Sequence, residues 1–525
     1  MVTFMSPQDS AQRAETVRAR HVQVSDEGRP EAVGRQHDLG KLTARERIGL
    51  LADAETFHEF GALVGPGPAQ QGSEQASAPA DGVITGTARV DGRPVVVASF
   101  DFTVLGGSNG AAGGLKVAHC AERATHDRTP LIMLLDGGGH RIQEGLDSRH
   151  FAHGFRFFQR MVDLSGLVPT VSVMMGPGFA GPSNFAALCD LVVMVRGTST
   201  MGIAGPTLVA AATGEQLSKD ELGGADVQTG HGIADLATDT EQEALDAVRV
   251  FLGYLPSHTD APPFTIDTPV EEPPGAANID GLVPAGTRQA YDVGDVIEAL
   301  ADRDTAFELC AAHAPNVITA LTRIGGRPVG VVANQPLHLG GALDSAGCEK
   351  SAHFVSMCDA FGVALLFLID IPGFLVGTAA ESTQLARRSG RLLFELGQAS
   401  VPRFSVVLRK GYGAGYIAMA GGRSFAADLA LAWPTAEICA MPVEGAVDIA
   451  YRRDVDAAPD PAMRREELIS GFRANIDPYL AADGFGVDGV VTPSRTRALL
   501  LEALARVPAR REVRVAGKRH AISPI

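Results

Sequence analysis

The sequence predicts an α/β protein built from two copies of one domain. Its composition, 45% hydrophobic and 20% charged with 60 glycines, is typical of a well-packed α/β fold. Its 525 residues exceed the usual size of a single hydrophobic core, so we expect at least two domains. The segment RVDGRPVVVAS (89–99) returns as RIGGRPVGVVA (323–333), an offset of 323 − 89 = 234 residues.

The offset persists along the chain, which identifies an internal duplication. Matching pairs are Leu105-Gly106-Gly107 with Leu339-Gly340-Gly341, Lys116 with Lys350, Ala118-His119 with Ala352-His353, and LLD (134–136) with LID (368–370). Near the end of the repeat, Ala180-Gly181 of GPGFAG (176–181) matches Ala414-Gly415 of GYGAGYIAMAGG (411–422).

Each copy alternates short apolar runs with helical stretches, the pattern expected of βα crossovers around a buried sheet. The first copy predicts strands at 95–100, 131–136, 171–175 and 191–195, with helices at 116–127 and 183–190. The second predicts strands at 329–333, 364–370, 404–409 and 429–433.

Composition divides the chain into three parts. Residues 1–34 are polar and charged and predict a peripheral helical arm. The Pro- and acid-rich passage 260–281 reads as an extended connection between the copies. We therefore expect a first domain over 35–281 and a second over 282–525.

Charge and cysteine usage exclude several classes of protein. A net charge of −16 argues against a binder of nucleic acid or of an anionic membrane. The six cysteines form no CxxC pair and are expected to be buried, reduced thiols of a cytoplasmic protein. The N-terminus lacks a secretory pattern, and the longest apolar runs are strand-sized, so no membrane span is expected.

The two Ala-Gly turns have a chemical interpretation. Each follows a strand and precedes a helical stretch, so free backbone N–H groups would face a negative oxygen at close range. This is the design of an oxyanion hole, in which side-chain identity hardly matters. The alternative is that small residues only permit close strand–helix packing. Two turns at equivalent positions of a repeat favour the oxyanion hole.

Several long motifs, in order, resemble the biotin-dependent acyl-CoA carboxyltransferase subunits, such as the β subunit of propionyl-CoA carboxylase. The resemblance covers nearly all of residues 38–525 and rests on GKLTARERIGLLAD (40–53), DFTVLGGS (101–108), RIQEG (141–145), ELGGA (221–225), AYDVGDVI (290–297), GRPVGVVANQP (326–336), DIPGFLVGT (370–378), LRKGYGAGY (408–416) and AWPTAEI (432–438).

The resemblance implies two fused crotonase-like (ClpP/crotonase) domains, assembled into a homo-hexamer, a trimer of dimers. The N-terminal domain would bind the CoA thioester and the C-terminal domain carboxybiotin. Ala180 and Gly181 would hold the thioester oxygen as an enolate, and Ala414 and Gly415 the ureido oxygen of biotin. Carboxybiotin would release CO₂, the biotin nitrogen would remove the α-proton, and the enolate would attack CO₂ without a side-chain base.

Departures from the family pattern concentrate on the acyl-CoA side. The family usually reads SGGAR where this chain has Gly137-Gly138-Gly139-His140-Arg141, and GPCAGGAVYSPAL where it has GPGFAGPSNFAAL. The expected substrate contacts are therefore Gly138, Gly139, His140, Arg141, Phe179, Pro182 and Asn184, with Phe185 also near the first turn. Because these surroundings differ, we expect a substrate other than propionyl-CoA.

Tyr416 and Ile417 follow the biotin-side turn and are the remaining expected substrate contacts. Propionyl-type members of the family commonly carry Asp where this chain has Ile417, at a site associated with acyl-chain choice. An apolar residue there indicates a different acyl group. The alternative is ordinary packing of Ile417 on an apolar helix face.

Repeated polar residues carry weaker signals. His140 and Arg141 suit either a thioester or CoA phosphate contact or a structural loop role. Asp136 and Asp370 end equivalent strands, where turn or helix capping is expected. Lys116 and Lys350 suit either anion contacts or a solvated helix face. His119 and His353 lack a third ligand at suitable spacing, so no metal is expected.

The chain has no Ala-Met-Lys-Met biotin-attachment run, the nearest being Ala-Met-Pro-Val at 440–443. It also lacks the length and Gly-rich loop of an ATP-grasp domain. We therefore expect a separate biotin carboxylase and biotin carboxyl carrier subunit as partners. Two alternatives stay open: a decarboxylase or transcarboxylase subunit that runs the same half-reaction, or a hydratase-like CoA-ester enzyme or scaffold without biotin chemistry.

Overall fold

The computed structural model describes residues 7–65, 78–152, 156–267 and 273–510. The chain divides into two compact units, Met1–Ala261 and Pro262–Ile525. This division falls earlier than the domain boundary expected at residue 281. Ile279 accounts for part of this difference, because it precedes that boundary and is buried in the core of the second unit.

The first unit contains a seven-stranded sheet in the order β1-β2-β3-β4-β5-β7-β9. Strands β1 to β3 pair antiparallel, whereas β3, β4, β5, β7 and β9 run parallel. The bounds are β1 His58–Phe60, β2 Val83–Val90, β3 Arg93–Phe100, β4 Leu131–Leu135, β5 Thr170–Met174, β7 Leu191–Val195 and β9 Leu236–Thr238. Two short strands, β6 Pro177–Phe179 and β8 Thr200–Gly202, form a separate parallel pair.

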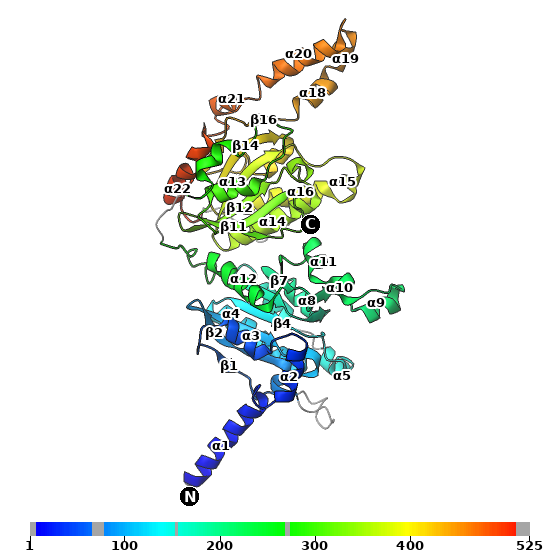
Figure 1. Cartoon of the computed structure of the whole chain (residues 1–525), viewed down its shortest axis with the longest axis vertical. Helices are drawn as coiled ribbons and strands as arrows, with labels where there is room; N and C mark the ends of the chain where they lie inside the picture. Colours follow the sequence, from blue (N-terminus) through cyan, green and yellow to red (C-terminus); the bar gives the residue numbers. More distant parts are fainter. Residues whose placement is uncertain (1–6, 66–77, 153–155, 268–272, 511–525) are drawn as a thin grey trace. The chain divides into compact units, whose positions relative to one another are not determined.

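Helices cover this sheet, and α3 and α4 both contact β2 and β3 (Figure 1). The core combines Val96 and Ala98 of β3 with Val117 and Cys120 of α4 and Phe157 of α7. The bounds are α1 Pro7–Val24, α2 Pro30–Asp38, α3 Ala44–Leu51, α4 Ala111–Asp127, α5 Ile142–Gly145, α6 Ser148–Phe151, α7 Arg156–Leu164, α8 Gly181–Ala186, α9 Pro206–Thr213, α10 Lys219–Gly223, α11 Ala225–Gly230 and α12 Glu241–Tyr254.

The second unit repeats the plan with a sheet in the order β10-β11-β12-β13-β14-β15-β17, and β16 pairs with the end of β14. The bounds are β10 Phe307–Leu309, β11 Val317–Ile324, β12 Arg327–Asn334, β13 Ala364–Ile371, β14 Arg403–Tyr412, β15 Leu429–Ala432, β16 Glu437–Cys439 and β17 Gly489–Val490. Every strand predicted in either copy overlaps an observed strand, which confirms the α/β fold.

Helices of the second unit include α14 Ser345–Ala360, which matches α4 after the 234-residue offset, and α17 Gly413–Ala418, which follows β14. Its core joins Val329 and Val331 of β12 with Val296 of α13 and Leu500 of α22. The other bounds are α13 Val293–Leu300, α15 Thr378–Ser382, α16 Leu385–Gln398, α18 Val443–Ala450, α19 Arg452–Ala457, α20 Pro461–Arg473, α21 Pro478–Asp483 and α22 Thr496–Arg506.

In both units the central strands are parallel, so their carboxyl ends lie at one edge of the sheet. In the first unit Leu135 and Met174, the last residues of β4 and β5, are register partners. The chain leaves both strands into glycine-rich turns at this edge, where open α/β sheets place their ligands. No helix within the described residues is long and apolar enough to cross a membrane.

Candidate active site

The first Ala-Gly turn lies between β6 and α8. Ala180 adopts φ 61° and ψ −114°, and its amide donates to the Gly202 carbonyl at 2.9 Å. The next amide, that of Gly181, begins α8 and has no acceptor within the described part of the chain. Of the two amides expected to hold an oxyanion, that of Gly181 is therefore free to donate, whereas that of Ala180 is hydrogen-bonded to β8.

A second open amide lies beside this turn. Gly139 follows β4 with φ 86°, and a Cβ atom at this position would lie 3.0 Å from the Phe179 carbonyl oxygen. The Gly139 carbonyl accepts from the Asn109 amide, while its own amide has no acceptor among the residues described. Gly139 and Gly181 thus present two unused donors from neighbouring strand ends.

Side chains around the first turn fix its shape. Ser183 Oγ donates to the Gly178 carbonyl and accepts from the Gly202 amide at 2.8 Å. The Phe179 ring lies against Gly202, where an added Cβ would approach it to 3.2 Å. Pro182 is buried, whereas Asn184, Ala180 and Gly138 are exposed. Around this turn, Gly138 and Asn184 are therefore the exposed members of the expected substrate contacts.

In the second unit, β14 runs directly into α17. Gly413 begins the helix with φ 63°, so Ala414 and Gly415 occupy its first turn, where amides lack intrahelical acceptors. Neither amide has another acceptor within the described residues. A Cβ atom on Gly415 would lie 2.7 Å from Ile371 Cδ1 and 3.1 Å from Gly373 Cα, so the position requires glycine.

Gly373 completes this second cluster and was not among the expected site residues. It lies 234 residues after Gly139, and its carbonyl accepts from the Leu343 amide just as Gly139 accepts from Asn109. Its own amide has no acceptor in the part of the chain that is described. The repeat was the signal that could have identified it, because DIPGF (370–374) aligns with DGGGH (136–140).

The exposed face of α17 consists of Ala414 and Ile417, which are one helical turn apart. Ile417 is 45% exposed, so it does not serve as core packing within the unit. The Tyr416 ring instead turns inward against Gly411 and Gly421, and burial raises the pKa of its hydroxyl to about 12. Ile417 is therefore the better placed of the two for a substrate contact.

The loop after β4 has internal partners. Arg141 is 2% exposed and pairs with Asp81 at 2.5 Å and Glu144 at 3.2 Å. Those carboxylates in turn accept amides at the start of α4, because Asp81 accepts from Gly113 and Glu144 from Ala111. The Arg141 guanidinium thus holds the loop to α4. His140 stacks edge-on against Phe151 at 5.9 Å.

The capping role expected for Asp136 and Asp370 is wrong. Both carboxylates are fully buried and form ion pairs, Asp136 with Lys41 and Arg47, and Asp370 with Arg409 and Lys410. Sequence reasoning missed the partners of Asp136 because they come from a distant segment of the chain.

Both interpretations of Lys116 and Lys350 were also wrong. Each side chain is buried and donates to backbone carbonyls, Lys116 to Ala80 and Val83, and Lys350 to Cys310, His313 and Val317. Burial lowers the pKa of Lys116 to about 8. The expected buried thiols are confirmed for Cys120, Cys189, Cys348 and Cys358, while Cys310 and Cys439 are partly buried.

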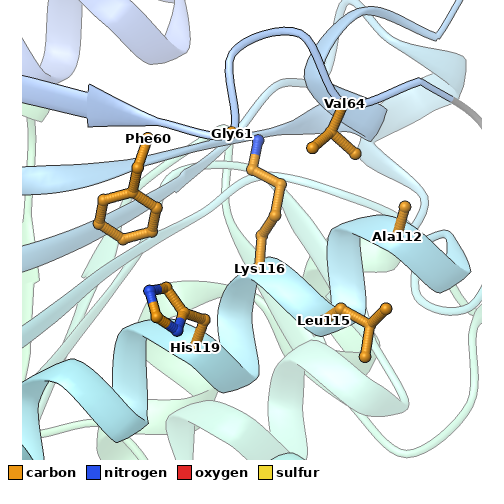
Figure 2. Close-up of a pocket in the computed structure, with 7 residues that line it drawn as sticks. All are labelled: Phe60, Gly61, Val64, Ala112, Leu115, Lys116 and His119. Carbon is orange, nitrogen blue, oxygen red and sulfur yellow. The ribbon is translucent and has the colours of Figure 1, made fainter.

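A cavity of about 380 Å³ borders Lys116 but is separate from the turns. Figure 2 shows Lys116 extending from α4 toward Gly61, with His119 beside Phe60. The rest of the lining is Val64, Ala112 and Leu115, and none of the residues expected to hold an oxyanion or contact substrate at the two turns lines it. No cluster of three or more His, Cys, Asp or Glu side chains suited to a metal occurs among the described residues.

The chain matches a known protein family and several characterised relatives. Residues 35–522 match the carboxyl transferase domain family. The chain is 40% identical over 504 residues to the propionyl-CoA carboxylase carboxyltransferase subunit of Haloferax mediterranei, covering 95% of this chain and 97% of the relative. It is 35% identical over 517 residues to the methylmalonyl-CoA decarboxylase subunit alpha of Veillonella parvula, covering 98% and 99%.

Among solved structures, the chain resembles the transcarboxylase 12S hexamer with methylmalonyl-CoA and methylmalonic acid bound. The TM-score is 0.92 at 36% identity, covering 100% of this chain and 99% of the other. The chain belongs to the carboxyl transferase domain family, with its crotonase-like fold. It is an enzyme subunit, an acyl-CoA carboxyltransferase of the biotin-dependent class.

Proposed function

We propose that the chain transfers CO₂ from carboxybiotin to the α-carbon of an acyl-CoA, and that each unit holds one of the two oxygens that gain negative charge. The observation that supports this is the repetition of unused amides at equivalent strand ends: Gly139 and Gly181 in the first unit, and Gly373, Ala414 and Gly415 in the second.

In the first unit, the Gly139 and Gly181 amides would donate to the thioester oxygen as the enolate forms. Backbone donors held by a sheet edge need no reorganisation when charge develops, and loss of one such donor typically slows kcat by about 10²–10³. The Ala180 amide would not take part, because it donates to Gly202. Ala180 would instead set the direction of the Gly181 amide.

The second unit fits the ureido group of biotin. Ala414 and Gly415 present amides in the first turn of α17, and the exposed Ala414 methyl leaves the approach open. When bound, carboxybiotin supplies CO₂ and then a nitrogen that accepts the substrate α-proton. The chain itself would contribute donors that stabilise the ureido oxygen, and the turns GPGFAG and GYGAGY contain no acid or histidine for proton transfer.

The decisive experiment isolates the Gly415 amide. Purified protein, free biotin and a panel of malonyl-, methylmalonyl- and longer-branched carboxyacyl-CoAs are incubated, and decarboxylated esters are followed by mass spectrometry. Gly415→Pro removes the amide hydrogen, while Gly415→Ala retains it and measures the cost of the crowded Cβ that both substitutions add. Gly445→Pro is the matched control, because Gly445 is also the third residue of its helix, α18, with open space around it.

Biotin-dependent CO₂ loss that is abolished in Gly415→Pro and retained in Gly445→Pro is the expected result. If no ester reacts, even with a biotin carrier supplied, the carboxyltransferase proposal fails. The preferred ester identifies the acyl group, which we propose is not propionyl. Ile417→Asp should shift that preference toward propionyl-type esters, because it restores the charge common in such members of the family.

We also propose that the chain assembles as a homo-hexamer and works with a separate biotin carboxylase and biotin carrier. The hexameric 12S structure supports the first point, and the relatives' membership in biotin-dependent complexes supports the second. Affinity purification from the native cell, followed by streptavidin blotting, should recover a biotinylated partner. A co-purifying ATP-dependent carboxylase would mark the carboxylation direction, and a membrane-bound pump subunit would mark decarboxylation.

A further inference from the structure

Each unit buries one carboxylate directly before a donor turn. Asp136 follows the last residue of β4 and precedes Gly137, and Asp370 lies near the end of β13, three residues before Gly373. Both are 0% exposed. A buried carboxylate needs compensating partners, so the arrangement of those partners shows what the carboxylate holds.

In the first unit the partners come from the segment around α3. Lys41 Nζ lies 2.6 Å from Asp136 Oδ1, and Arg47 Nη1 lies 2.8 Å from Asp136 Oδ2. Gly176, just after β5, makes room for this pair, because a Cβ atom there would lie 1.8 Å from Asp136 Oδ1. The carboxylate therefore sits between the chain leaving β4 and the chain leaving β5.

In the second unit the partners come from the neighbouring strand. Arg409 Nη2 of β14 lies 2.9 Å from Asp370 Oδ2, and Lys410 Nζ lies 3.2 Å from Oδ1. The Lys410 main-chain amide also donates to Asp370 Oδ1 at 3.1 Å. Asp370 thus ties β13 to β14 at Lys410, which lies three residues before Gly413, where α17 begins.

The same charge arrangement is therefore built from different positions. Lys410 is the repeat equivalent of Gly176, since 410 − 234 = 176, so the second unit carries its ammonium where the first unit has no side chain. Conversely, matching LLAD (50–53) to ALAD (299–302) pairs Arg47 with Val296, which lies in an apolar core. Arg47 and Lys410 thus supply positive charge at positions where the other unit has no cation.

Stability alone is a weak reason to keep such a group, because well-packed apolar residues often replace buried ion pairs without loss. We infer that Asp136 and Asp370 are positioning residues, each fixing the strand ends that carry its unit's amide donors. This inference rests on the proposed function, because it assigns a purpose to donors that act on an oxyanion.

The test compares Asp370→Asn with a matched variant at the opposite end of the strands. Asp302→Asn is that control, because Asp302 also accepts two amides, from Gly325 and Gly326, and pairs with Arg497. Folding of this unit is followed by the fluorescence of the buried Trp433, the only tryptophan in the chain, during urea unfolding. Activity is measured as biotin-dependent decarboxylation of the preferred ester.

Asp370→Asn should lower kcat by at least about tenfold, because small displacements of oriented groups cost that much, while KM for the ester changes little. Asp302→Asn should lower the urea midpoint and leave kcat at the wild-type value. Should Asp370→Asn yield too little folded protein, Lys410→Met tests the same contact with one cation removed, and a smaller fall in kcat is expected.

Wild-type kcat in folded Asp370→Asn or Lys410→Met would overturn the inference, as would a kcat loss equal to that of Asp302→Asn at the same folded fraction. An inactive wild-type protein would instead count against the proposed function. The two failures are therefore distinguishable, since the inference is judged only by ratios to an active wild type.

Discussion

The two Ala-Gly turns have the same sequence but are built differently. In the first unit, β6 breaks away from the main sheet to pair with β8, and Ala180 takes a left-handed φ of 61° that few non-glycine residues adopt. In the second, β14 continues through Tyr412, and Gly413 supplies the positive φ at little cost. The number of open amides differs accordingly, with the Ala180 amide occupied and the Ala414 amide free.

The repeat thus preserves an arrangement of donors and charges more closely than it preserves the residues that produce it. A carboxylate with two cations precedes each set of donors, yet its cations come from α3 and its preceding loop in one unit and from β14 in the other. Substitutions at positions that differ between the two units therefore test whether each arrangement depends on its own cations.

The largest effect is expected from Arg47→Met in the first unit. Arg47 is fully buried and bonds both Asp136 and Glu241, so its loss leaves two carboxylates without a guanidinium. Breaking a buried pair in this way costs about 3–5 kcal/mol of unfolding free energy. Urea unfolding followed by far-UV circular dichroism measures it. Arg160→Met, which removes partly exposed pairs with Glu122 and Asp163, should cost at most about 1 kcal/mol.

A smaller loss is expected from Gly176→Ala, which adds the Cβ atom that Lys410 already carries in the other unit. The new atom would overlap Asp136 Oδ1 and approach Lys41 Nζ to 2.8 Å. Overpacking of this kind costs about 1–3 kcal/mol. Gly253→Ala in α12 is the control, since nothing lies within 4 Å of its added atom. Equal melting temperatures for the two variants would contradict the predicted overlap between the new Cβ at position 176 and Asp136.

Much of the fold was predictable because strand and helix signals are local. The apolar run 404–409 lies within β14, and the run 131–136 covers β4 and extends one residue beyond it. The repeat located both Ala-Gly turns. What could not be predicted depends on distant contacts. Asp136 meets Lys41 across 95 residues of sequence, so no local pattern reveals that pair.

Contacts between distant residues also decide which amides of the candidate site are free. The repeated Ala-Gly turns predicted Gly181 and Gly415 as donors, and the family resemblance placed Gly139 among the substrate contacts, but neither shows which amides are already occupied. Occupation of the Ala180 amide depends on Gly202, which a separate strand pairing brings to it. The charge of Lys116 predicted contact with solvent or an anion, whereas its ammonium group donates to the buried carbonyls of Ala80, before β2, and Val83, the first residue of β2.

The conformations of the turns give a third prediction, in which one substitution has opposite effects. Ala180→Gly should stabilise the first unit by about 1 kcal/mol, because relief of the strained φ outweighs the added backbone freedom. Ala414→Gly should destabilise the second unit by up to about 1 kcal/mol, because Ala414 lies in a helix. Calorimetry of both variants measures the signs. A loss of similar size in each would mean that Ala180 is not strained.

The smallest predicted change is in the pKa of His37 and concerns α3, the helix that carries Arg47. His37 Nε2 lies 2.9 Å from Glu46, whose hydrogen bond raises the His37 pKa above 6.5. A raised folded pKa stabilises the protein below pH 6.5 and loses that contribution as pH rises through the folded value. Glu46→Gln should therefore lower the His37 pKa, measured by NMR of histidine ring carbons. Glu221→Gln breaks a similar capping box beside Ser218 and should leave His37 unchanged; a shift there would point to a global cause.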